Sequence, residues 1–178
     1  MQPWAAKRCD AIGCGKGTLG RAVDDTMDPY ITSCAPFGIP RLMNHAGPFE
    51  VLQTPGRVLM LFETGNSIRQ IWMDGRGHPE DLDPSWMGHA IGHWEGDTLV
   101  VDTIGMTDKS WLDTAGHPHS DALHIVERIR RVDHDTLENT QGLLAVQFFS
   151  RGASPDATVG GKAVRDCGLR HGTARPRK

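Results

Sequence analysis

The sequence predicts a mainly β protein: an antiparallel sheet or a small lipocalin-like barrel, with a short N-terminal helix and a disordered C-terminal tail. Two observations support this class. Apolar and polar residues alternate over short segments, and turn residues separate these segments, in a chain of 178 residues with 21 Gly and 11 Pro. We expect three parts: a helix and extended arm (1–48), a β-rich domain (49–149) and a basic, disordered tail (150–178).

The first part combines a helical pattern with a proline-rich segment. Pro3 suits a first helical turn, and the apolar residues that follow it predict a helix over residues 3–14. The glycine-rich segment 13–20 follows no strand and lacks the order of a phosphate-binding loop, so we interpret it as a connector. The prolines of residues 24–48 predict an extended arm, anchored by Phe37, Ile39 and Leu42.

The β-rich part begins at Phe49, where the texture of the sequence changes. Pro55-Gly56 and Glu95-Gly96-Asp97 each separate two apolar runs and predict hairpins. The run over 57–64 is apolar on both faces at its centre, which favours a strand buried on both sides. Residues 121–132 also fit a helical period, but their β-branched residues favour a strand. The expected strands are 49–54, 57–64, 67–73, 89–94, 98–103 and 121–132, followed by strand-like pieces at 136–140 and 143–149.

Composition limits the partners that we expect. The net charge of −3 argues against nucleic acid, and no apolar run reaches the ~20 residues that span a bilayer. The first residues contain no apolar signal core, so we expect the cytoplasm. The four cysteines (Cys9, Cys14, Cys34 and Cys167) form no C-x-x-C motif, and we expect free thiols; Cys9–Cys34 and Cys14–Cys34 disulfides are the alternatives. Nothing in the sequence predicts an oligomeric state.

Long segments resemble a family of uncharacterised bacterial proteins. The resemblance rests on CAPFGIPR (34–41), PFEVLQTPG (48–56), IWMDGRGHPEDLDPSWMGHAIGHWEGDTLVVDT (71–103) and GHPHSDALHIVERIRRVDHDTLE (116–138). It implies a β-rich fold and, because such proteins often carry a leader, export. It implies no activity. From about Asn139 onward the chain departs from the family pattern, as a frameshift or a truncation would produce.

Residues 83–127 concentrate the groups that could carry chemistry, with five of the nine histidines and three of the five tryptophans. Imidazole is the most common metal ligand. His117 and His119 form an H-x-H pair whose side chains point the same way in an extended chain. On a strand, His89 and His93 would lie ~13 Å apart, which is too far for both to bind the same ion. We therefore expect a metal site on His117 and His119, completed by His89, His93 or His124.

These residues predict a metal-dependent hydrolase of a small ester or lactone. Histidine ligands favour Zn²⁺, which lowers the pKa of bound water to ~7, and Glu127 or Asp121 would act as the base. The acidic loops over 75–85 and 107–116 offer Ca²⁺ as an alternative ion, although they match no EF-hand. In the competing interpretation the histidines only bond backbone groups in the loops.

Two further interpretations stay open. Ser85 and Ser120 lie near histidines, but neither has the G-x-S-x-G context of a serine nucleophile, so a serine hydrolase is disfavoured. The tryptophans could instead line the mouth of a barrel. The alternative function is therefore a non-enzymatic β-barrel that binds an apolar small molecule, and both functions imply a small-molecule partner.

Overall fold

A computed structural model describes residues 2–16 and 26–144 and confirms the mainly β class. Seven strands form one sheet and are ordered in it as they are in the chain. The strands are β1 (Phe49–Thr54), β2 (Arg57–Phe62), β3 (Ser67–Trp72), β4 (His89–Glu95), β5 (Thr98–Ile104), β6 (His124–Arg131) and β7 (Leu137–Leu144). The helices are α1 (Pro3–Ile12), α2 (Pro29–Ser33), and the 3-10 turns η2 (Arg41–Asn44) and η3 (Thr64–Asn66).

Strand pairing follows the predicted hairpins except at one place. Consecutive strands pair antiparallel from β1 to β3 and again from β4 to β7. Strands β3 and β4 run parallel and share only two residue pairs, Ile71–Ala90 and Trp72–Ile91. Parallel neighbours need a crossover instead of a tight turn, and the long segment 73–88 supplies it. The sheet is therefore mixed, whereas the sequence predicted antiparallel pairing throughout.

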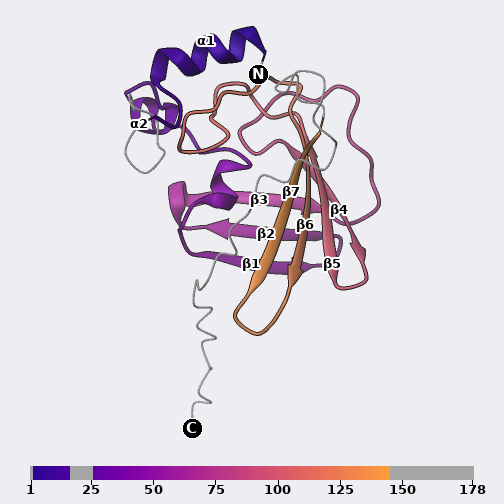
Figure 1. Cartoon of the computed structure of the whole chain (residues 1–178). Helices are drawn as coiled ribbons and strands as arrows, with labels where there is room; N and C mark the ends of the chain where they lie inside the picture. Colours follow the sequence, from indigo (N-terminus) through magenta and orange to yellow (C-terminus); the bar gives the residue numbers. More distant parts are fainter. Residues whose placement is uncertain (1, 17–25, 145–178) are drawn as a thin grey trace.

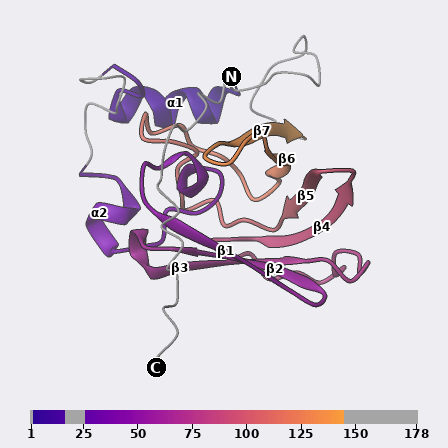
Figure 2. The ribbon, with the colours of Figure 1, turned by 90° about the horizontal axis from the view of Figure 1, so that it is seen from below.

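The sheet curls into a half-barrel. Strands β1–β3 run across β5–β7, and β1 and β7 form its two outer edges (Figures 1 and 2). The concave face carries apolar side chains such as Met60, Ile71 and Val101. Residues of the N-terminal arm complete this core, and the predicted anchors Phe37, Ile39 and Leu42 are all buried in it. The arm is thus part of the β domain's core.

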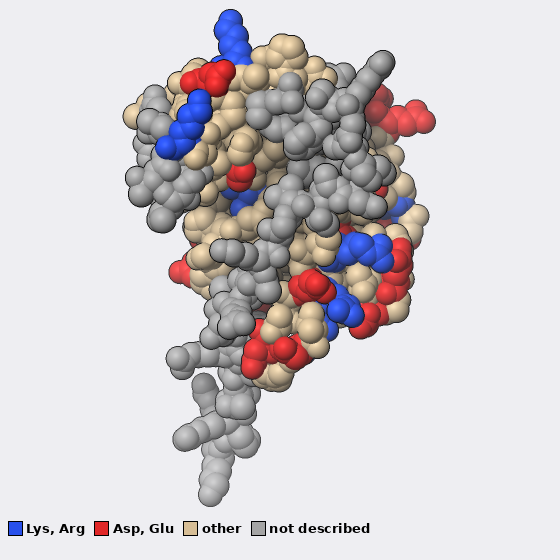
Figure 3. Space-filling model, in the orientation of Figure 1, with Lys and Arg blue, Asp and Glu red and all other residues tan. Residues whose placement is uncertain are grey.

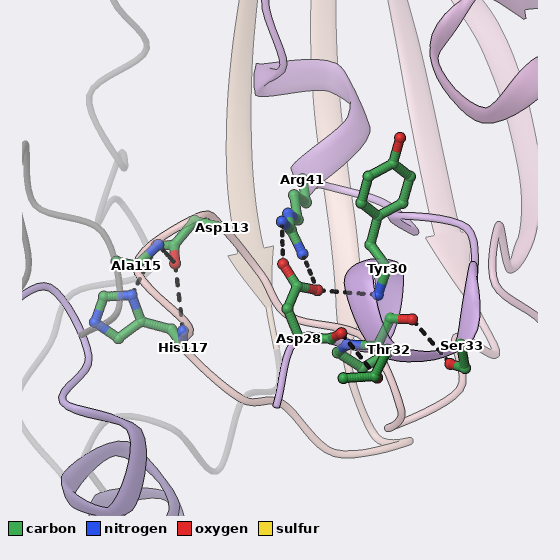
Figure 4. Close-up of polar contacts among 9 residues, drawn as sticks. Asp28, Tyr30, Thr32, Ser33, Arg41, Asp113, Ala115 and His117 are labelled. Carbon is green, nitrogen blue, oxygen red and sulfur yellow. Dashed lines mark hydrogen bonds and ion pairs between the residues drawn. The ribbon is translucent and has the colours of Figure 1, made fainter. Parts of the chain in front are cut away.

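The arm is less extended than predicted, because Asp28 organises it into short helical turns. The Asp28 carboxylate accepts a hydrogen bond from the backbone N–H of Tyr30, which caps α2. It also accepts two bonds from the Arg41 guanidinium, at 2.9 and 2.6 Å (Figure 4). Asp28 and Arg41 are both buried, so this bidentate pair is shielded from solvent and holds α2 against η2.

Helix α1 confirms the predicted N-terminal helix but ends at Ile12, two residues before the expected end. Gly13 adopts the left-handed conformation, with φ of 63°, and closes the helix. The expectation of free thiols is wrong here, because Cys9 and Cys14 form a disulfide across this turn. Cys34 is a free, exposed thiol, and Cys167 lies outside the described residues. The two alternative disulfides are also excluded by this pairing.

Other expectations were met in part. Leu59 and Leu61 on β2 are only half-buried, so that strand is fully covered on one face. The piece at 136–140 belongs to one continuous strand, β7, while most of the piece at 143–149 and the whole predicted tail lie outside the described residues. On the face drawn in Figure 3, acidic and basic side chains lie next to one another. The exposed pair Arg128–Glu95 joins β6 to β4 across the intervening strand β5. Within the described part, no helix has the length and apolar character needed to cross a membrane.

Candidate active site

The structure does not bring the four predicted metal ligands together. His93 is exposed and contacts Glu95, while His89 contacts His78. His117 contacts Asp113, and His119 is fully buried against Ser110. The predicted H-x-H geometry does not form, because residues 117–119 are not a regular strand. His117 is part-buried and contacts Asp113, whereas His119 points inward and is fully buried. Among residues 2–16 and 26–144, no group of three or more His, Cys, Asp and Glu is arranged to hold a metal ion.

The two predicted bases also lie apart from these histidines. Asp121 is exposed in the turn that precedes β6. Glu127 has no exposed surface and faces the core, where it forms an ion pair with Arg69 of β3. Thr103 and Gln141 add hydrogen bonds to this pair, at 3.0 and 3.3 Å. In this arrangement the Glu127 carboxylate neutralises a buried cation.

A different pair of side chains meets in the loop between β5 and β6. Trp111 and Pro118 form an antiparallel bridge, and the Leu112 N–H donates to the His117 carbonyl over 2.8 Å. The loop is therefore folded back on itself. Antiparallel pairing of 111 with 118 sets Ser110 opposite His119, so two residues nine positions apart come face to face.

The contact between these two residues has a defined proton arrangement. Ser110 Oγ lies 2.8 Å from His119 Nε2, and His119 Nδ1 lies 3.0 Å from the backbone carbonyl oxygen of Ser120. A carbonyl only accepts, so Nδ1 carries the imidazole proton and donates it to Ser120. Nε2 is then the unprotonated nitrogen and accepts the hydrogen bond from the Ser110 hydroxyl. This is the arrangement of a serine and its general base.

Burial keeps His119 in the neutral form that this arrangement needs. Burial lowers the pKa of His119, and this outweighs the hydrogen bond to Ser120 and the charge of Asp108, which both raise it. Arg8 adds a smaller lowering effect. His119 therefore stays unprotonated at neutral pH, with Nε2 free to accept a proton.

Ser110 lies in the wall of a cavity of about 150 Å³. Helix α1, the start of α2 and the β5–β6 loop enclose the cavity. Its wall is mixed, with Ile12, Met27, Trp111, Arg8, Lys109 and Asp108 among the lining residues. An apolar cavity of about this volume holds benzene in another protein, so the space suits a ligand with a few carbon atoms.

The surrounding loop holds Ser110 and His119 in their positions. Asp113 Oδ1 accepts hydrogen bonds from the backbone N–H groups of Ala115, at 2.9 Å, and His117, at 3.3 Å (Figure 4). The His117 Nδ1–H donates to Asp113 Oδ2 over 2.7 Å, and this hydrogen bond raises the pKa of His117. Asp113 therefore closes the turn that sets Ser110 opposite His119.

Gly38 and Arg41 of the arm support the other side of the loop. Gly38 has φ of 74°, and a Cβ atom there would lie 2.9 Å from Ser110 Oγ. A side chain at this position would displace the serine, so glycine is required on both counts. The guanidinium carbon of Arg41 lies over the Trp111 ring, 5.7 Å from its centre, which is within the range of a cation–π contact.

A second group of polar residues lies on the convex face of the sheet, opposite the concave face that carries the apolar core. His78 Nε2 and His124 Nε2 both contact Asp102 Oδ1, at 3.0 and 2.8 Å. His78 Nδ1 in turn lies 2.9 Å from His89 Nδ1. All four side chains are part-buried. We call this set, His78, His89, Asp102 and His124, the convex-face cluster.

Ser110 and His78 are functional candidates that sequence reasoning missed. Ser110 carries no local motif, and its partner is nine residues away. A turn signal was nevertheless present, since Asp113 and Gly116 are typical turn residues, and folding the loop about them pairs 110 with 119. His78 lies in the β3–β4 crossover, and no periodic pattern relates its position to the strands.

The chain matches no protein-family model, no curated protein and no solved structure. The resemblance to uncharacterised bacterial proteins stays a prediction. The functional argument therefore rests on geometry.

Proposed function

We propose that the protein hydrolyses small esters or lactones, with Ser110 as the nucleophile and His119 as the general base. One observation carries the proposal: the Ser110 hydroxyl donates to an imidazole nitrogen at 2.8 Å, in the wall of a cavity. The substrate class is the one predicted from the sequence. The mechanism differs, because a serine replaces the metal-activated water.

The chemistry follows the two steps of covalent acyl transfer. As Ser110 Oγ attacks the substrate carbonyl, His119 Nε2 takes the hydroxyl proton and then delivers it to the departing alkoxide oxygen. Water then attacks the acyl-serine as His119 Nε2 takes its proton; the bond to Ser110 Oγ breaks, Nε2 returns the proton to Oγ, and the acid is released. The Ser120 carbonyl holds the imidazole in the required tautomer, which is the positioning role that a carboxylate has in a triad.

Cavity size and charge define the substrates that fit. The volume of about 150 Å³ favours short acyl groups. Arg8 and Lys109 in the wall supply positive charge near Ser110, which suits the anionic intermediate of acyl transfer. Trp111 and Ile12 provide apolar surface for the acyl chain.

Two alternatives keep the status of predictions. One is hydrolysis of the same substrates by Zn²⁺ held by His89, His93, His117 and His119, with Glu127 or Asp121 as the base; Ca²⁺ in the acidic loops 75–85 and 107–116 is the alternative ion. It requires these side chains to move together from their separate positions. The other is binding of an apolar small molecule without turnover, for which Trp111 in the cavity wall is the favouring observation.

The test is hydrolysis of p-nitrophenyl acetate, p-nitrophenyl butyrate and γ-butyrolactone by the full chain with its disulfide intact. We expect Ser110→Ala and His119→Gln each to lower kcat/KM by at least about 10³-fold, because the nucleophile and base act as a unit. A fluorophosphonate should label the wild-type peptide that contains Ser110 and leave Ser110→Ala unlabelled.

Ser85→Ala is the matched control. Ser85 is exposed, and its hydroxyl donates to the Gly88 carbonyl instead of a histidine. It should retain wild-type kcat/KM. Turnover that survives Ser110→Ala but is lost after chelation would support the metal mechanism and overturn the serine one. Binding without turnover in the wild type would support the binding alternative.

A further inference from the structure

The outer face of β1–β3 carries a group of aliphatic side chains. Residues two apart on a strand share a face, so Leu59 and Leu61 of β2 both point away from the side that carries the buried Met60. The strand register sets Leu52 of β1 opposite Leu59, and Ile68 of β3 opposite Leu61. Side chains opposite one another on one face lie close enough to touch. We call these four residues, Leu52, Leu59, Leu61 and Ile68, the outer patch.

The outer patch is open to solvent. Ile68 is 62% exposed and Leu52 is 36% exposed, while Leu59 and Leu61 between them are part-buried. Strands β1–β3 lie at the outside of the molecule, with α1 and β7 on their other side (Figure 2). The convex-face cluster lies on the other half of the sheet, formed by β4–β6. A contiguous apolar surface of this kind marks a contact with another molecule.

The sequence of β2 predicts a cover for this side of the strand. Its residues 58–62 are apolar at every position, which is typical of a strand buried on both faces. The core covers the face that carries Val58, Met60 and Phe62. The structure describes no element that covers the other face within residues 2–16 and 26–144, so a second partner is needed for Leu59 and Leu61.

The C-terminal residues 150–178 are a poor match for this role. Their large aliphatic residues are Val159, Val164 and Leu169, which stand five positions apart among seven basic residues. In an extended segment, residues five apart point to opposite faces. Such a segment cannot present these three side chains together to the outer patch.

The two ends of the outer patch carry opposite charges. Glu50 of β1 lies opposite Leu61 at one end, and Arg57 of β2 lies two residues before Leu59 at the other. Both charged side chains are exposed. Their positions are four residues apart along the strands, or ~13 Å, which is too far for an ion pair within one chain. A second copy of the same face offers each of them a partner of opposite sign.

We propose that two copies of the chain associate through the outer patch, sheet face against sheet face. A two-fold axis that runs across the strands turns one copy end for end. The Glu50 end of each patch then faces the Arg57 end of the other, and the aliphatic residues meet in the centre. The same contact forms twice, as a two-fold interface requires. Sheets packed in this way lie ~10 Å apart, with the side chains of the two faces interdigitated.

The size of this face sets the strength of the association. Three strands of six residues cover about 14 by 20 Å. This is far less than the ~800 Å² that each partner buries in a standard interface. We therefore expect a reversible dimer that dissociates on dilution. The face contains neither Ser110 nor His119, so the association is independent of the proposed hydrolysis.

The test is sedimentation velocity of the full chain with its disulfide intact, at concentrations from about 5 to about 500 µM. Exposed Cys34 and any other free thiol are first alkylated with iodoacetamide, so that no disulfide can link two copies. We expect the wild type to shift from monomer to dimer across this range. Ile68→Glu should raise the dissociation constant at least about tenfold, because each copy would bury a carboxylate against apolar side chains.

Ile31→Glu is the matched control. It makes the same change at an isoleucine that is 53% exposed but lies on α2, outside the outer patch. It should dimerise like the wild type. Circular dichroism of both variants checks that they keep the β fold. A second readout is Tm, which should rise with protein concentration in the wild type and in Ile31→Glu, but not in Ile68→Glu.

Charge reversal tests the arrangement without changing the apolar contacts. Glu50→Arg should weaken the dimer, because it brings like charges together at both ends of the interface, and adding Arg57→Glu should restore it. The proposal is overturned if the wild type stays monomeric at the highest concentration, if Ile31→Glu weakens the dimer as much as Ile68→Glu, or if the double reversal stays as weak as Glu50→Arg. None of these results bears on ester hydrolysis.

Discussion

A single imidazole, His119, decides what the β5–β6 loop can do. Its Nδ1–H donates to a carbonyl that belongs to the next residue, so the tautomer is set by the local backbone and does not need a third side chain. Its position in the sequence suggested a metal ligand, and the prediction that this histidine carries chemistry is kept in the proposed mechanism. Its partner could not be predicted, because Ser110 faces it only once the turn at Asp113 has formed.

The titration of His119 predicts the acid limb of the pH–rate profile. Burial lowers its pKa below the ordinary value of 6.5, so the neutral base persists under mildly acidic conditions. As pH falls through this lowered pKa, Nε2 becomes protonated and cannot accept from Ser110, and kcat/KM for p-nitrophenyl acetate should fall. We expect an inflection below pH 6.5, measured between pH 4 and 9 with about half-unit steps. An inflection above 6.5 would contradict the assignment.

The same shift affects stability with a definite sign. The unfolded chain binds a proton at His119 near pH 6.5, while the folded protein resists protonation to lower pH. Stability from this group is therefore fully present above pH 6.5 and is lost as pH falls through the folded pKa. His117 behaves in the opposite way, because Asp113 raises its pKa and its contribution is lost as pH rises.

At the scale of elements, alternation along the strands predicted the hairpins but not the burial of two charged residues. Glu127 shares the inner face of β6 with Ile125, and Arg69 shares the inner face of β3 with Ile71, and all four side chains are buried. The sequence had predicted Glu127 as a catalytic base. The Arg69–Glu127 pairing was not predicted, because β3 and β6 are not neighbours in the sheet and meet only when it curls.

Glu127 is expected to be among the most sensitive positions of the sheet. Glu127→Gln leaves the fully buried Arg69 without a counter-charge, and two of its nitrogens, Nε and Nη1, already lack partners. Breaking a buried pair in this way costs about 3–5 kcal/mol of unfolding free energy. Urea denaturation followed by tryptophan fluorescence measures it.

Glu138→Gln provides the matched comparison on the adjacent strand. Glu138 pairs with Arg130 at 3.3 Å, and both side chains are about half exposed. Exposed pairs contribute about 0–1 kcal/mol, so the midpoint should barely move. If the two variants lost the same unfolding free energy, breaking the buried Arg69–Glu127 pair would be no more destabilising than breaking an exposed one.

The whole molecule is a half-barrel whose open side is filled by the N-terminal arm. Composition and periodicity predicted the β class and six of the strand positions closely. They did not predict the parallel pair of β3 and β4, since a long loop carries no signal for the direction in which the chain returns. They also missed the helical turns of the arm, because these depend on Asp28 and Arg41 meeting across 13 residues.

Backbone amides should exchange fastest at the edge of the sheet and slowest at its centre. Strand β5 is hydrogen-bonded on both sides and contains the buried Leu99, Val100 and Val101. Strand β1 is an edge strand, and every residue after Phe49 in it is exposed. Amides of β5 should exchange only through global unfolding, while those of β1 should exchange at least about tenfold faster by local opening. Mass spectrometry of peptic fragments measures this, and equal protection of both strands would contradict it.

The narrow seam between β3 and β4 divides the sheet into two meanders, β1–β3 and β4–β7. Each meander places one member of the Arg69–Glu127 pair in the core, so each alone would expose or bury an uncompensated charge. Neither half is therefore a self-sufficient folding unit, although each is built from local hairpins. A chain break within residues 73–88 should give two fragments that aggregate separately and assemble when co-expressed, which makes this crossover the natural place to divide the protein into a complementing pair.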